Sequence, residues 1–217
     1  MVRVIASISS RRSFARKAGF EEYERRRKEI IARAASVFRE KGFEAANLAE
    51  IARKAGMDRT SIYYYYKSKK ELFRELVGEA YADSVVMAEE IAELDATPSS
   101  KVRLLIERLF EIYEARYPYL FIYIQEDMTT FASGKTAWNA KMRLLAKRFD
   151  QAIVKIVQAG LDDGSFYPEG DARLITAGII GMCNWSHRWF EPGKHDRSKI
   201  TANFSNMILR GLSKDDT

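Results

Sequence analysis

The residues best suited to chemistry form a short basic, hydroxyl and aromatic run near the middle of the first half of the chain. Arginine and hydroxyl side chains hydrogen-bond to base edges and to phosphates, whereas tyrosine offers a hydroxyl and a flat ring. The run has no acidic residue after Asp58, and three lysines follow it. The candidate DNA-binding residues come from this run and the three lysines, with Asn47 from the preceding segment: Asn47, Arg59, Thr60, Ser61, Tyr63, Tyr64, Lys67 and Lys69.

Two short helices are expected to position this run. Asn47 is a good N-cap, and Glu50 completes a capping-box pattern for a first helix that ends near Gly56. Asp58 can cap a second helix by accepting from the amide of Ser61, and Ile62 would face inward. Two short helices joined by a glycine-containing turn are typical of a helix-turn-helix, whose second helix enters the major groove.

The alternative is an ordinary capped helix pair without a DNA partner. Lys67, Lys69 and Lys70 favour the DNA reading, because lysines disfavour a helix N-terminus unless phosphate lies nearby. The charge distribution favours it too. Residues 1–78 carry 19 Lys and Arg against 10 Asp and Glu, whereas residues 79–217 carry 17 against 20. A basic domain joined to a near-neutral one is typical of a DNA-binding protein with a partner domain.

The pattern along the chain predicts an all-α fold in three parts. Residues 1–20 form a basic N-terminal arm, residues 21–68 a three-helix helix-turn-helix domain, and residues 69–217 a helical effector-binding and dimerisation bundle. A long helix from Lys69 towards Glu93 joins the last two parts, and further helices span about 102–116, 136–161, 171–190 and 197–212. The apolar segment from Tyr117 to Phe131 is read as a buried helix rather than a strand.

Two interpretations of the arm remain open: a disordered solvated tail, or a basic arm that follows the minor groove or the phosphates.

No run of 18 apolar residues occurs, so no membrane span is expected, and the N-terminus lacks a signal-peptide pattern. A single cysteine, Cys183, excludes an internal disulfide and suits a cytoplasmic protein.

The second cluster of interest lies near residue 185. Trp185 and Trp189 would share a helix face with Arg188 close by, and Asn184 adds an amide to an apolar helix. An arginine beside tryptophans can hold a phosphate or stack on a base. The alternative places both tryptophans in the core or a dimer seam, with Arg188 paired to a carboxylate. Aromatic residues that could line an apolar tunnel are Tyr113, Tyr117, Phe121, Tyr123, Phe131 and Phe149.

Small residues on the helix before this cluster suggest a close helix–helix contact. Ala177, Gly178 and Gly181 favour a homodimer seam, because a helix-turn-helix protein that reads a two-fold operator usually dimerises. Packing within one chain is the alternative.

Catalysis finds little support in the sequence. The only histidines, His187 and His195, belong to no metal-ligand motif, and no glycine-rich phosphate loop is present. Cys183, His187 and Glu191 fall at four-residue intervals, but one such triple on a helix is a weak metal signal. The chain is therefore expected to be neither an enzyme nor a cofactor-binding protein.

The segment AGMDRTSIYYYYKSKKELF resembles the helix-turn-helix signature of the TetR family of transcriptional regulators. The resemblance implies phosphate contacts near Asn47, Tyr64 and Lys69 and base contacts from Arg59, Thr60 and Ser61. Asp58, Thr60 and Asn47 replace the family's usual Ser, Gly and Thr, so the operator sequence does not transfer.

The segment GSFYPEGDARLITAGIIGMCNWSHRWFEPG resembles the TetR subgroup that senses acyl-CoA thioesters and represses fatty-acid, phenylacetate or steroid-ring degradation. The resemblance implies a homodimeric repressor that binds a palindromic double-stranded operator and is released by a small-molecule effector, an acyl-CoA. The effector-binding residues expected are Tyr117, Phe121, Phe149, Asn184, Trp185, Arg188 and Trp189. The alternatives are a drug-responsive repressor with a promiscuous aromatic pocket and an architectural DNA-binding protein without effector.

Overall fold

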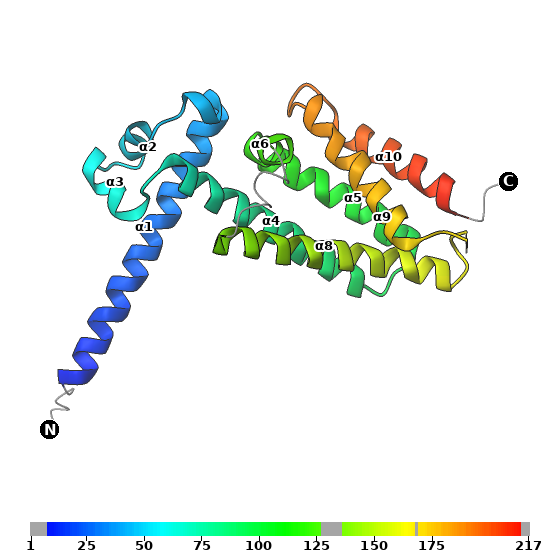
Figure 1. Cartoon of the computed structure of the whole chain (residues 1–217), viewed down its shortest axis with the longest axis horizontal. Coiled ribbons are helices and arrows are strands. Elements are labelled where there is room, and N and C mark those ends of the chain that lie inside the picture. Colours follow the sequence, from blue (N-terminus) through cyan, green and yellow to red (C-terminus); the bar gives the residue numbers. More distant parts are fainter. Residues whose placement is uncertain (1–7, 127–135, 168, 214–217) are drawn as a thin grey trace, which may run out of the picture. The chain divides into compact units, whose positions relative to one another are not determined.

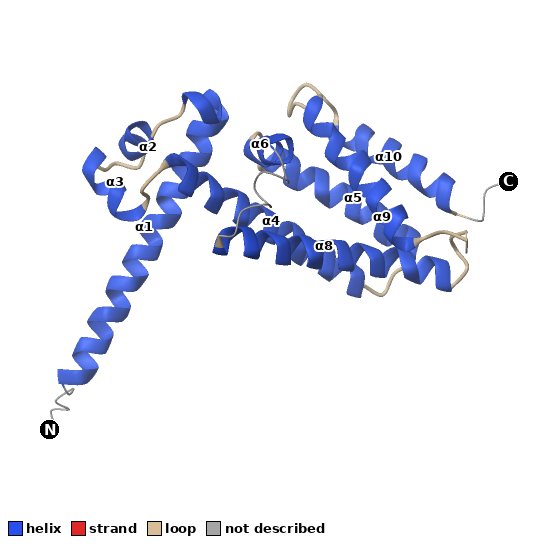
Figure 2. Cartoon of the chain, in the orientation of Figure 1, coloured by secondary structure: helices blue, strands red, loops and turns tan. Residues whose placement is uncertain are grey.

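The computed structural model describes residues 8–126, 136–167 and 169–213, and all its regular elements are helical (Figures 1 and 2). The described residues form two isolated β-bridges and no strand, which confirms the all-α prediction. No helix in the described ranges has the length and hydrophobicity needed to cross a membrane. The chain divides into two compact units, Met1–Glu75 and Leu76–Thr217.

The first unit contains α1 (Ile8–Ala45), α2 (Leu48–Lys54), α3 (Arg59–Tyr65) and the start of α4 (Lys69–Glu93). Gly42 interrupts α1 with φ +77° and ψ 169°, a conformation that favours glycine. The core of the unit gathers apolar side chains from all four helices: Ile30, Ala34, Val37, Phe38, Ile51, Ile62, Leu72 and Phe73.

The N-terminal segment differs from the expected aperiodic arm. α1 begins at Ile8, so most of residues 1–20 is helical and continuous with the first helix of the domain predicted over residues 21–68. Residues 1–7 lie outside the described ranges. The sequence pattern failed here because residues 8–20 lack the apolar stripe by which a core-facing helix is recognised.

The second unit contains the rest of α4, then α5 (Pro98–Ala115), α6 (Tyr119–Glu126), α8 (Ala137–Asp162), α9 (Ala172–Trp185), the short 3₁₀ helix η1 (Ser186–Arg188) and α10 (Arg197–Leu212). α5 packs against α8, α9 and α10, and α8 packs against α9 (Figure 1). Ion pairs from Glu89 to Arg148 and from Glu93 to Lys155, each 2.6 Å, join α4 to α8.

The segment predicted as one helix over residues 171–190 is shorter. α9 stops at Trp185, and the backbone N–H groups of Trp189 and Phe190 both donate to the carbonyl of Ser186. Phe190 is fully buried against Phe110, with ring centroids 5.7 Å apart. Burial of this ring explains why the chain leaves the helix there: a continued helix would point the residue elsewhere.

Candidate DNA-binding surface and effector pocket

Side-chain caps fix the two short helices of the first unit. Asn47 Oδ1 accepts from the N–H of Glu50 at 3.0 Å, and Asp58 Oδ1 accepts from the N–H groups of Thr60 and Ser61 at 2.8 and 2.9 Å. The Ser61 hydroxyl donates to Asp58 Oδ2 at 2.5 Å. These bonds, the Ser61 hydroxyl foremost, hold the pKa of Asp58 below its usual range. Both predicted caps are therefore present, and they set the N-terminus of α3.

The outer face of α3 carries the residues predicted to meet DNA. Arg59, Thr60 and Tyr63 are exposed, and Tyr64 is 74% exposed, whereas Ile62 lies in the core as expected. Ser61 is half-buried and its hydroxyl is committed to the cap, so this side chain positions the helix start. Exposed arginine, threonine and tyrosine at the start of the second helix match the geometry by which such helices read a major groove.

An open hollow of about 530 Å³ lies between the start of α2 and α3. It brings together residues predicted separately from the sequence, because Asn47, Arg59, Tyr63 and Lys69 all line it. Lys69 also has a second role that the sequence did not indicate. Its Nζ donates to the backbone carbonyls of Phe43 and Glu44, each at 2.8 Å, and lies 4.6 Å from the centre of the Phe43 ring. Lys69 therefore ties the end of α1 to the start of α4. Lys67 is exposed.

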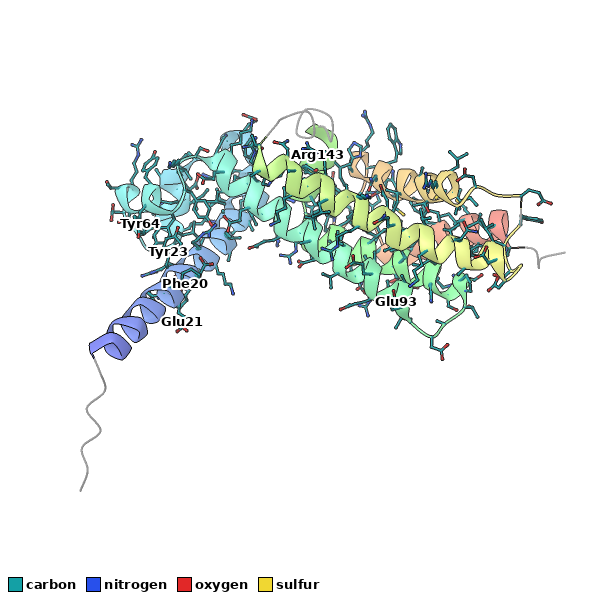
Figure 3. All side chains as sticks on the ribbon, turned by 60° about the horizontal axis from the view of Figure 1, so that its bottom comes forward. Phe20, Glu21, Tyr23, Tyr64, Glu93 and Arg143 are labelled. Atoms are coloured by element: carbon teal, nitrogen blue, oxygen red, sulfur yellow. The ribbon has the colours of Figure 1, made fainter. Side chains whose placement is uncertain are left out.

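A tyrosine cluster joins α3 to α1. Tyr23 stacks on Tyr65 with centroids 5.1 Å apart and meets Tyr64 edge-on at 5.8 Å, as Figure 3 shows for Tyr23 and Tyr64. Arg27 lies 5.6 Å from the Tyr66 ring and forms an ion pair of 2.5 Å with Glu75 of α4. Of the four consecutive tyrosines, Tyr63 and Tyr64 are exposed, whereas Tyr65 and Tyr66 hold α3 on the unit.

The second unit encloses a cavity of about 240 Å³. Its walls are mostly apolar, and its polar groups come from Tyr81, Ser84, Tyr113, Tyr123, Asp150 and Asn184. The Tyr113 hydroxyl donates to Asn184 Oδ1 at 2.6 Å, and burial raises the pKa of the Tyr113 phenol well above its usual value. The full lining consists of Tyr81, Ser84, Leu109, Tyr113, Leu120, Tyr123, Ile124, Ala146, Phe149, Asp150, Ile180 and Asn184.

A larger groove of about 1,020 Å³ runs between α8 and α9 and shares Ala146, Asp150, Ile180 and Asn184 with the cavity. Three cations line the groove: Arg143 and Lys147 from α8 and Arg173 from α9. Asp150 is exposed here, yet the surrounding protein desolvates its carboxyl enough to raise its pKa. A cationic groove that adjoins an apolar cavity suits a molecule with an anionic part and an apolar part.

The predicted effector residues fall into two groups. Phe149 and Asn184 line the cavity, whereas Tyr117, Phe121, Trp185, Arg188 and Trp189 are absent from the lining of both spaces. Phe121 is core, packed on Tyr113 at 5.2 Å and on Tyr117 at 5.9 Å.

The tryptophans do not share a helix face as expected, because α9 ends at Trp185 and Trp189 lies beyond η1. Trp185 is 60% exposed, and the Arg188 guanidinium lies 5.1 Å from its ring. His187 and Glu191 both lie beyond the end of α9, which contains Cys183, and the described residues contain no group of ligands that could hold a metal.

Comparison with known proteins settles the family. Residues 30–76 match the model described as "Bacterial regulatory proteins, tetR family", and residues 95–212 match the "Tetracyclin repressor-like, C-terminal domain". The chain belongs to the TetR family. It is 30% identical over 195 residues to the HTH-type transcriptional repressor KstR2 of Mycolicibacterium smegmatis, a match that covers 87% of this chain and 91% of that one.

Two solved structures share the fold. The ketosteroid transcriptional regulator KstR2 of Mycobacterium tuberculosis superposes with a TM-score of 0.73 at 25% identity, over 88% of this chain and 96% of that one. AibR, solved in complex with isovaleryl coenzyme A and operator DNA, gives a TM-score of 0.69 at 18% identity, over 85% and 98%. The family description and the KstR2 repressor agree with the prediction that this TetR-family chain is a DNA-binding transcriptional regulator rather than an enzyme.

The sequence missed several residues that line the cavity and the groove of the second unit. Tyr81 comes from α4, Asp150 from α8 and Ile180 from α9, and the groove cations were not singled out at all. A lone carboxylate beside the apolar stripe of residues 142–157 was a usable signal for Asp150, because such a group calls for a polar partner or a ligand. Phe131 lies outside the described residues.

Proposed function

We propose that this TetR-family protein is a repressor that binds a palindromic operator as a homodimer and is released by an acyl-CoA thioester. On this proposal it regulates lipid or aromatic-acid degradation. The observation that carries the effector class is the pairing of an apolar cavity with an adjoining groove lined by Arg143, Lys147 and Arg173. An acyl chain suits the cavity, and the phosphates of coenzyme A suit the cations.

The names of two relatives support the same class. KstR2 is named as a ketosteroid regulator, and AibR was solved with isovaleryl coenzyme A and operator DNA. The drug-responsive alternative rests on a different observation, the tyrosines Tyr81, Tyr113 and Tyr123 around the cavity, because aromatic walls accept many apolar ligands.

Exposed apolar and small residues on α9 and α10 support the homodimer. Leu174 and Trp185 on α9 and Met207 on α10 are each at least 60% exposed. Gly178 and Gly211 have open space where a Cβ would lie. Large exposed apolar side chains beside small residues are typical of a surface that another helix pair covers. The measurement is the mass of the protein in solution by sedimentation equilibrium, and a monomer at micromolar concentration contradicts this part of the proposal.

Thermal unfolding tests the effector class. The protein is heated alone and with free coenzyme A, acyl-CoAs of increasing chain length, and free fatty acids. A ligand at about 100 times its dissociation constant stabilises the folded state by roughly 2.7 kcal/mol, a shift that is easy to measure. We expect stabilisation by some thioesters, weaker stabilisation by the matching free acids, and release of an operator selected from random duplexes.

Two variants then separate the groove from the residues at the end of α9. Arg173→Gln removes a groove cation, whereas Arg188→Ala removes the arginine stacked on Trp185. Loss of thioester stabilisation in Arg173→Gln supports the groove as the phosphate site. Loss in Arg188→Ala alone supports instead the assignment made from the sequence, in which Arg188 beside the tryptophans holds the phosphate. If no thioester raises the unfolding temperature, the acyl-CoA proposal is contradicted and the drug-responsive alternative replaces it.

A further inference from the structure

The segment Ile8–Phe20 of α1 carries positive charge only. Arg11, Arg12, Arg16 and Lys17 are its charged residues, and the first acidic residue of the chain is Glu21. The backbone of this segment is helical and continuous with the rest of α1. The family model matches residues 30–76, so this segment lies outside the helix-turn-helix that defines the family.

Charges further along α1 are paired within the protein. Arg25 pairs with Glu22 and Glu29, Arg26 lies 2.8 Å from Glu29, and Arg27 pairs with Glu75. The excess positive charge of this region is therefore concentrated before Glu21. The exclusively basic segment and the segment of paired charges therefore belong to the same helix, α1.

Cations at the N-terminal end of a helix oppose its macrodipole and weaken that end. The first turn of α1 contains no acidic residue to offset this effect. Among the side chains of α1 whose burial is described, which begin at Gly19, the first fully buried apolar one is Ile30. A basic helical extension of this kind is best stabilised by an external polyanion.

The extension is held in a fixed relation to α3. Tyr23, one turn after Phe20, stacks on Tyr65 and touches Tyr64, which is the exposed tyrosine of the recognition helix (Figure 3). Phe20 itself is 64% exposed. At about 1.5 Å per residue, the helix from Phe20 to Ile8 reaches roughly 18 Å beyond this contact. Duplex DNA presents one phosphate per about 1.7 Å of its axis, so this length faces several phosphates.

We propose that Ile8–Phe20, anchored by Tyr23 to Tyr64 and Tyr65, is a second DNA-contacting element that binds the phosphate backbone beside the site read by α3. This inference rests on the DNA-binding function and adds to it a basic helix that widens the contacted duplex. The contact carries no sequence information of its own, because phosphates are the same at every step.

Salt dependence of DNA binding tests the proposal. Arg12 and Arg16 are four residues apart and therefore on one side of the helix, so Arg12→Gln/Arg16→Gln removes one pair of neighbouring charges. If both bind phosphates in each protomer of the dimer, the slope of log K against log salt falls in magnitude by about 3.6, or 0.9 for each of four phosphates. Between about 50 and 200 mM salt, the variant then loses roughly 100-fold less affinity than the wild type.

The matched control is Lys141→Gln/Lys199→Gln, which removes two exposed charges from α8 and α10 of the other unit. We expect this control to keep the wild-type slope. Hydroxyl-radical footprinting of the full-length protein gives a second readout: Arg12→Gln/Arg16→Gln should lose protection only at sugars flanking each half-site. Tyr23→Leu keeps all charges but releases the anchor, and it should lower the salt slope.

Unchanged salt slope and footprint in Arg12→Gln/Arg16→Gln overturn the proposal. A loss of affinity with the wild-type slope overturns it as well, because it indicates damage to folding rather than lost phosphate contacts. Binding of the wild type to phosphatidylserine vesicles, abolished in this variant while DNA binding stays intact, would assign the segment to a lipid surface instead. A wild-type protein that binds no duplex at all contradicts the DNA-binding function itself and is recognised as a separate failure.

Discussion

Replacing Lys69 with methionine should destabilise the first unit, whereas the same change at Lys67 should not. Methionine keeps most of the stem that lies over Phe43 and removes the ammonium, so the substitution isolates two hydrogen bonds to the carbonyls of Phe43 and Glu44. Hydrogen bonds from charged donors contribute about 1.5–3 kcal/mol each when buried, and the cation over a ring about 0.5–1 kcal/mol. Because Lys69 is only half-buried, solvent weakens these interactions, and we expect the free energy of unfolding to fall by about 2 kcal/mol.

Urea unfolding followed by circular dichroism measures this loss, and hydrogen exchange of peptides from residues 38–75 locates it. Lys67→Met is the matched control: Lys67 is exposed, so its free energy of unfolding should change by less than ~0.5 kcal/mol. Phosphate contact is expected of both lysines, so each variant should lower the salt slope of DNA binding. A Lys69→Met protein as stable as Lys67→Met would refute the structural role, and the two carbonyl bonds would then carry no measurable energy.

Three further predictions follow from single residues. Asp58 has a folded pKa below its unfolded value, so its cap contributes stability above about pH 4 that is lost as the pH falls through the folded pKa; Asp58→Asn should flatten this acid limb in pH-dependent unfolding. Burial raises the pKa of Cys183 to about 12, so iodoacetamide at about pH 8 should label it in urea but hardly in the native protein, as mass spectrometry would reveal. A Cβ at Gly160 would lie 2.3 Å from the Phe166 ring, so Gly160→Ala should destabilise by about 1–3 kcal/mol despite its gain of ~1 kcal/mol in helix propensity, and an unchanged melting temperature would contradict the close packing.

Local signals were sufficient for most helix bounds. α10 spans Arg197–Leu212, as the pattern predicted, because Asp196 caps its start with bonds to the N–H groups of Ser198 and Lys199. Caps and apolar stripes act within a few residues, so one sequence contains the whole of this information. The helix-turn-helix was predictable for the same reason.

The effector site was predictable only in part, because its geometry depends on which helix faces converge. The cavity takes side chains from five helices that are far apart in the sequence, and spacing along one helix cannot reveal the others. Phe190 illustrates the limit: its burial against Phe110 and Phe121 ends the helical path and moves Trp189 away from Trp185. Tertiary packing overrode a continuous helical pattern.

The boundary between the two units falls inside α4, so on the proposed function this helix is the physical connection for effector release. Its first two turns contribute Lys69 and Glu75 to the DNA-binding unit, and later turns contribute Tyr81 and Ser84 to the cavity wall. A ligand weakens operator binding only if its affinity differs between the two states, by ~1.4 kcal/mol for each tenfold loss. On the proposed function, an acyl group in contact with Tyr81 supplies that difference, because a displacement of this wall moves the same helix that anchors α1. A ligand confined to the groove of α8 and α9 touches no residue of α4 and should bind without releasing DNA.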